Sequence, residues 1–255
     1  MSMSRKKEAS IELLGSYTDD IGRTTLKRYD DPNYVREENH GLYTGEGLIL
    51  LKANSLLRQI DKDNFHLMMG SISTGHSGLY SRHPYPFYAQ EHHNVSKDEY
   101  RGFAYGSAAI GSSSRMRNIV KYGQSNWWFY VDDDPHGGIN LDHPGAYRLP
   151  TDRALLKITA LQKPNIIEIV SFGVSAWLNS RKEPNDTSSK IMSWFGFKAI
   201  EFTGYESKIL NFFKKKFDNN LRKQYNRSDY INVLIGIYFK DPNHPFHVLS
   251  EGLEL

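Results

Sequence analysis

Residues 47–60 carry apolar side chains around nearly the whole circumference of a helix. Those side chains are Leu48, Ile49, Leu50, Leu51, Ala53, Leu56, Leu57 and Ile60. A helix that is apolar on all sides belongs in the interior of a domain. Other elements must therefore cover it, and a chain of 255 residues is long enough for one good-sized domain.

The remaining chain predicts further helices. Apolar side chains recur at helical spacing in residues 96–110, 112–122, 151–161, 164–178, 187–199, 207–223, 230–239 and 245–250. The β-branched residues of 164–178 are also compatible with a buried strand. Most connections are short, and only residues 66–94 and 126–150 form long irregular stretches. Since short connections favour antiparallel neighbours, we expect a mainly α fold of helical hairpins.

Residues 1–40 differ from the rest of the chain because they are polar and contain one short apolar cluster, at residues 11–14. This composition is typical of an extended arm or a poorly ordered lead-in, with short strands at most. We therefore expect an N-terminal arm over residues 1–40 and a single helical domain over residues 41–255.

The composition excludes several classes of protein. Cysteine is absent, which excludes disulfides, cysteine-ligated metals and a thiol nucleophile. No apolar run is long enough to span a membrane, and the basic N-terminus has no apolar segment of a signal peptide behind it. The formal net charge of +3 is too small to indicate nucleic-acid binding by itself. We expect neither a membrane protein nor a cofactor.

Three carboxylates stand out as candidates for acid–base chemistry. Glu46 lies at the expected start of the buried helix, and Asp98 and Glu99 lie at the start of the helix over residues 96–110. Glycoside hydrolysis needs two carboxyl groups in one cleft, one protonated and one ionised. The alternative is that these acids stabilise helix N-termini, and Ser96 with Glu99 fits a capping box.

Histidines are concentrated in the first irregular stretch, at positions 76, 83, 92 and 93. They lack the spacing of a helical zinc motif, so we predict no metal site. His83 and His92 are better candidates for a general base or a hydrogen-bond donor. The second stretch contains Trp127 and Trp128 beside Asp132–Asp134, and aromatic faces next to acids suit a sugar-binding groove. The alternative is that one of these tryptophans anchors the loop to the core.

Residues 181–227 are basic, with eleven Lys or Arg against five Asp or Glu. Such a face suits an acidic partner or nucleic acid, although a solvated helix face has the same composition. The chain contains no phosphate-binding loop, dinucleotide-binding fingerprint or serine-nucleophile motif.

Several short segments resemble uncharacterised proteins of tailed bacteriophages. They are residues 45–48, 78–84, 97–102, 126–127 and 244–246, and their order is similar to that in the α/α-toroid glycosidases and polysaccharide lyases. The resemblance implies an incomplete toroid, since this chain is shorter than six helical hairpins. It also implies a central cleft lined by Glu46, His83, Asp98 and Glu99, with Arg82 and Trp127 nearby.

These observations lead us to expect a virion-associated protein, located in the phage particle or in the host cytoplasm before assembly, that binds or cleaves a host envelope polysaccharide. Glu46, Asp98 and His83 would be catalytic. The substrate-binding side chains would be Arg82, Glu99, His92, Trp127 and Trp128. The first alternative is an inactive structural protein that contacts other virion proteins through residues 1–40 and 181–227. A nucleic-acid-binding accessory protein is the more distant alternative.

Overall fold

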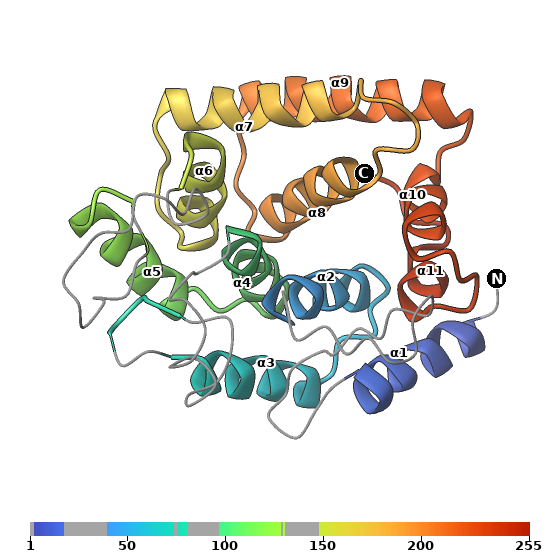
Figure 1. Ribbon diagram of the computed structural model, residues 1–255, viewed down its shortest axis with the longest axis horizontal. Coiled ribbons are helices and arrows are strands. Elements are labelled where there is room, and N and C mark those ends of the chain that lie inside the picture. Colours follow the sequence, from blue (N-terminus) through green and yellow to red (C-terminus); the bar gives the residue numbers. More distant parts are fainter. Residues whose placement is uncertain (1–2, 18–39, 74–75, 81–96, 129, 131–147) are drawn as a thin grey trace.

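The computed structural model of the chain describes residues 3–17, 40–73, 76–80, 97–128, 130 and 148–255. Within these ranges it contains eleven helices and no strand, apart from an isolated bridge between Ser73 and Tyr80. The helices are α1 (Met3–Tyr17), α2 (His40–Ala53), α3 (Gln59–Ser71), α4 (Lys97–Ile110), α5 (Ser114–Ser125), α6 (Pro150–Thr159), α7 (Ile166–Asn179), α8 (Ser188–Phe202), α9 (Lys208–Tyr225), α10 (Tyr230–Phe239) and α11 (Pro245–Ser250) (Figure 1). The mainly α prediction is confirmed, while the arrangement as an incomplete toroid stays a prediction.

Two predicted boundaries are wrong in the first half of the chain. The apolar helix ends at Ala53 rather than Ile60, because Ser55 has a positive φ of 57° and the chain turns there. Helix α3 then begins within the capping arrangement of Arg58 and Asp61, whose carboxylate accepts a hydrogen bond of 2.8 Å from the Arg58 amide. The stretch 66–94, predicted to be irregular, is therefore helical up to residue 71.

Two further differences concern later helices. The helix expected over residues 112–122 is α5, which continues to Ser125 and contains Gly123. The chain turns after that helix through positive φ angles at Trp127 and Trp128. The strand alternative for residues 164–178 is wrong, since Ile166–Asn179 forms α7 with Asn165 as its side-chain cap.

Helices α2 and α4 lie side by side at the centre of the fold (Figure 1). Their backbones touch at glycines, because a Cβ atom placed on Gly45 would overlap the carbonyl group of Gly102. A Cβ on Gly102 would in turn overlap the backbone of Gly41 and Leu42. Glycines at one-turn spacing, 41 and 45, thus allow an approach that any other residue would prevent.

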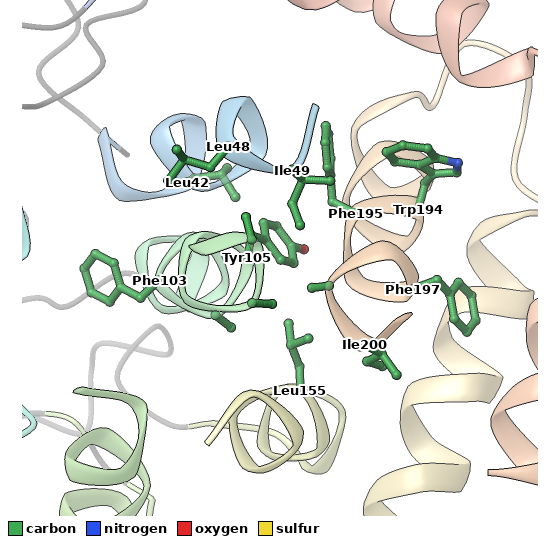
Figure 2. Packing of buried hydrophobic residues seen from close by; sticks show 14 of the residues in the cluster. Leu42, Leu48, Ile49, Phe103, Tyr105, Leu155, Trp194, Phe195, Phe197 and Ile200 are labelled. Carbon is green, nitrogen blue, oxygen red and sulfur yellow. The ribbon is translucent and has the colours of Figure 1, made fainter. Parts of the chain in front are cut away.

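The apolar side chains of α2 and α4 are covered by α6 and α8. Figure 2 shows Ile49 of α2 and Tyr105 of α4 directed toward Phe195 of α8, with Leu155 of α6 on the other side. All four side chains are buried. The expectation that the apolar helix lies in the interior is confirmed for residues 48–51, which are at most 4% exposed.

The predicted extended arm is wrong for residues 3–17, which form α1 and pack against α11. Ala9 and Leu13, one turn apart, are buried. The Lys6 ammonium donates hydrogen bonds of 2.6 Å to the Asn54 side chain and to the Glu251 carbonyl. Ala9 and Leu13, four residues apart, are the sequence feature that indicates a buried helix face here, but the polar residues around them obscured this pattern. Residues 18–39 lie outside the described residues.

No helix among the described residues has the length and apolar character needed to cross a membrane.

His244 caps the N-terminus of α11 and is fully buried. Its Nδ1 accepts a hydrogen bond of 3.1 Å from the Phe246 amide, and its ring stacks on Phe239 at 3.9 Å. Burial lowers the pKa of His244 to about 4, while Asp241 acts to raise it and His247 acts to lower it. The folded chain therefore holds this histidine in its neutral form.

We predict that Gly102→Ala lowers the free energy of unfolding by about 2–3 kcal/mol, because the added methyl group forces α2 and α4 apart. Gly70→Ala is the control, since only the Arg115 guanidinium lies near that Cβ position and alanine favours a helix. Urea unfolding followed by circular dichroism measures both variants. Equal stability of Gly102→Ala and the wild type would contradict the close approach.

We predict that His244→Asn reduces the loss of stability on acidification. A pKa lowered on folding means that the unfolded chain binds the extra proton, so the histidine costs stability as the pH falls below about 6.5. Asparagine keeps the acceptor for the Phe246 amide but does not titrate. Between pH 6 and 5, the difference in free energy of unfolding between wild type and variant should change by about 1.4 kcal/mol per pH unit. Parallel pH profiles in urea titrations would exclude this assignment.

Candidate functional site

A pocket of about 310 Å³ opens between α4, α6, α7 and α8. It is lined by Lys97, Asp98, Arg101, Tyr105, Thr151, Asp152, Leu155, Phe172, Ser175, Ala176, Asn179, Ser189, Met192 and Ser193. Its volume is at the lower end of the range for small-molecule sites. Hydroxyl, amide and charged groups thus meet two aromatic rings in one concave space.

Arg101 joins two carboxylates in this pocket. Its Nη1 lies 3.0 Å from Asp98 Oδ1, and its Nε lies 2.8 Å from Asp152 Oδ1. Burial acts to lower the pKa of Arg101, but the negative charges of Asp152 and Asp98 outweigh it, and the pKa is raised. The guanidinium group therefore stays charged and ties α4 to α6.

Asp152 is the more deeply buried of the two carboxylates. Its side chain is 3% exposed, compared with 25% for Asp98. Its second oxygen, Oδ2, is buried and makes no hydrogen bond to any residue that the structure describes. The charge of Asp152 is balanced through its other oxygen, Oδ1, which accepts a hydrogen bond of 2.8 Å from Arg101 Nε.

Tyr105 and Met192 form the wall of the pocket toward α2. The Tyr105 hydroxyl group donates a hydrogen bond of 2.9 Å to the Met192 carbonyl. Burial raises the pKa of Tyr105, so the phenol stays protonated and the hydrogen bond is kept. Met192 is thereby fixed between the pocket and the interior.

Glu46 lies behind this wall. It was expected at the start of a helix but lies in the middle of α2, where it is buried, so the helix dipole does not account for it. It lines a separate cavity of about 20 Å³, together with Met192 and mainly apolar side chains. Burial raises the pKa of Glu46 well above its usual value, and the negative charge of Asp98 raises it further. Glu46 and Asp98 therefore interact electrostatically but open onto different spaces.

Glu99 serves the packing of α2 and α4. Its side chain is fully buried, and its Oε2 accepts a hydrogen bond of 2.7 Å from the Gly41 amide. Amides in the first turn of a helix have no partner within that helix, so Glu99 of α4 caps α2. It does not line the pocket.

The two tryptophans have different environments. Trp128 is buried beside α6, with the cations of Arg153 and Lys157 at 5.2 and 5.3 Å from its ring. Trp127 is 83% exposed. Neither lines the pocket. Trp128 thus has the anchoring role that was the alternative interpretation of this pair.

Three predicted site residues, Arg82, His83 and His92, lie outside the described residues, as do His93 and Asp132–Asp134. Where the structure is described, no group of three or more histidines, aspartates or glutamates could hold a metal ion.

Sequence reasoning identified Asp98 but missed the residues around it. Arg101 follows Asp98 by three residues on the same helix, a spacing that permits an ion pair and was visible in the sequence. Asp152, Ser175 and Asn179 come from α6 and α7, and nothing in their local sequence indicates that they meet α4.

No protein-family model, no curated protein and no solved structure matches this chain.

We predict that Glu46→Gln becomes more stable relative to the wild type as the pH rises. The folded-state pKa of Glu46 is above its usual value of 4.5, so the carboxyl group favours folding fully below that pH and progressively less above it. Glutamine is similar in shape and has no proton to lose. Urea titrations from pH 4.5 to 8 measure the difference, with the exposed Glu12→Gln as the control. A constant difference between wild type and Glu46→Gln over this range would show that the carboxyl group is not held protonated.

Proposed function

We propose that this protein binds a carbohydrate in the pocket between α4, α6, α7 and α8. The observation that carries the proposal is the lining of this pocket, where the ion pair of Arg101 and Asp98 lies among hydroxyl and amide side chains. Sugar hydroxyl groups donate and accept hydrogen bonds, so one hydroxyl group can donate to Asp98, the more exposed of the two carboxylates, while another accepts from Arg101.

The other lining residues support this ligand class. Asn179, Ser175 and Thr151 offer further neutral hydrogen-bonding groups, and Phe172 offers an aromatic ring for the apolar face of a sugar. The formal charges of the lining cancel, with Lys97 and Arg101 against Asp98 and Asp152. A neutral saccharide therefore suits the pocket better than an acidic one, which would leave a charge uncompensated.

Binding without cleavage accounts for the carboxylates better than hydrolysis does. A glycosidase brings a protonated acid and an ionised base to the same bond. The group with a raised pKa, Glu46, lines a different cavity from Asp98, and Met192 lines both. Asp98 and Asp152 in turn both hold Arg101.

The biological setting of the proposal is a bacteriophage particle, with a host envelope polysaccharide as the source of the ligand. This part rests on the resemblance of the short segments to tailed-phage proteins.

A purely structural virion protein is the second candidate. It is favoured by the ion pairs of Arg101, which join α4 to α6 whether or not a ligand is present. In that case the pocket is a gap between helices, and saccharides do not bind to it.

We predict that the wild-type protein binds one or more neutral oligosaccharides and that Ser175→Phe weakens binding at least tenfold. Ser175 lines the pocket and its side chain forms no hydrogen bond with the residues that the structure describes, so the added ring fills the space. Ser171→Phe, one turn earlier on α7 and outside the pocket, is the matched control. Isothermal titration calorimetry against a panel of neutral and acidic oligosaccharides measures affinity, and product analysis of the same mixtures measures cleavage.

Three outcomes would contradict the proposal. No saccharide in the panel binds, or Ser175→Phe binds as tightly as the wild type does. Release of shorter sugars, abolished by Glu46→Gln or Asp98→Asn, would replace binding with hydrolysis.

A further inference from the structure

Helices α7 and α9 lie along one edge of the molecule (Figure 1). Several apolar side chains of these two helices are exposed. They are Ile166, Ile167, Val170, Leu178 and Phe212, which are 37–66% exposed, and we call this set the α7–α9 patch. Single exposed apolar residues are common on any protein, but neighbouring ones on two adjacent helices indicate a contact surface.

The two helices are close together and parallel. A Cβ atom on Gly173 of α7 would overlap the Phe213 ring of α9, so little separates them there. Seven residues further along both segments, the Asn220 side chain donates a hydrogen bond of 2.9 Å to Ser180 Oγ. Each residue of α7 thus lies beside the residue of α9 whose number is 40 higher. Phe212 therefore lies within one helical turn of the level of Val170.

The opposite side of α7 is already in use. Phe172, Ser175, Ala176 and Asn179 line the pocket described above, and Ile167 does not. The α7–α9 patch therefore belongs to a different surface, and an inference about it does not depend on the proposed saccharide site.

Cations accompany the patch along α9. Lys208 and Lys216 lie four residues before and four residues after Phe212, and Lys223 lies seven residues after Lys216. These spacings place the three lysines on the same face of α9 as Phe212. None of them forms an ion pair with a carboxylate that the structure describes, and the Lys216 ammonium lies 5.6 Å from the Phe212 ring centre. Lys214 and Arg222, on other sides of α9, are neutralised by Glu201, Asp218 and Glu254.

We propose that the α7–α9 patch binds an amphipathic acidic helix of another protein. Two parallel helices form a groove that accepts a third, whose apolar stripe covers Val170 and Phe212. Carboxylates on the flanks of that helix neutralise Lys216 and Lys223. A second copy of this chain is a poor occupant, because a two-fold contact would bring the lysines of one α9 against those of the other.

The test uses two fluorescein-labelled synthetic helical peptides and the full-length chain. Both peptides carry the same leucine stripe, and one has glutamates on its flanks where the other has lysines. Fluorescence anisotropy should show that the acidic peptide binds at least tenfold more tightly than the basic one, with an affinity that falls as salt is added.

Substitutions then locate the binding surface. Val170→Asp with Phe212→Ser should weaken binding of the acidic peptide at least tenfold, and Lys216→Glu with Lys223→Glu should remove the preference for it. Lys7→Glu with Lys121→Glu, at exposed positions on α1 and α5, is the control and should bind like the wild type. All these side chains are exposed or partly exposed, so circular dichroism should show unchanged folding.

The proposal is overturned if the acidic peptide does not bind, if both peptides bind equally, or if the patch substitutions have no effect. Sedimentation velocity and anionic vesicles distinguish the other occupants. A dimer that Val170→Asp dissociates would assign the patch to contact between copies. Binding to vesicles of phosphatidylserine without binding to the acidic peptide would assign it to a lipid surface.

Discussion

The backbone contact between α2 and α4 sets the position of the helices that pack directly on the pair, α6 and α8 among them. Gly41, Gly45 and Gly102 bring the two axes closer than side chains would allow, and the Glu99 carboxylate caps α2 from within α4. The glycines occupy the side on which the two helices touch. The apolar side chains of α2 and α4 project from their other sides, where α6 and α8 cover them. Burying a carboxylate next to this contact is tolerated because the Gly41 amide donates to it.

The same packing creates two spaces with different chemistry on either side of Met192. On the α2 side, apolar neighbours favour the protonated form of Glu46. On the α6 side, Arg101 offsets the negative charges of Asp98 and Asp152 and leaves one buried carboxylate oxygen to spare. Two carboxyl groups close in space thus have separate roles, since solvent and counter-charge reach only one of them. This separation is the physical reason for preferring ligand binding to hydrolysis.

Hydrophobic periodicity predicted the helices of the second half of the chain closely, because the loops between them are short; the side chains of Asn165 and Ser207 cap two of them. It misplaced α2, since glycines at 41 and 45 argue locally against a helix and only the contact with α4 explains them. Asp98 was found from its own position on a helix. Asp152 was not, because its importance comes from Arg101, and an ion pair between α4 and α6 leaves no mark on the sequence around either residue.

Helix α1 rests on α11, so the first of the described helices docks on the last of them. During synthesis, α1 leaves the ribosome long before α11 exists, so the surface on which it docks is incomplete until residues 245–250 have been made. Any chain that stops short of that point lacks the part of this surface that α11 supplies. The docked α1 thereby distinguishes chains translated through α11 from truncated ones.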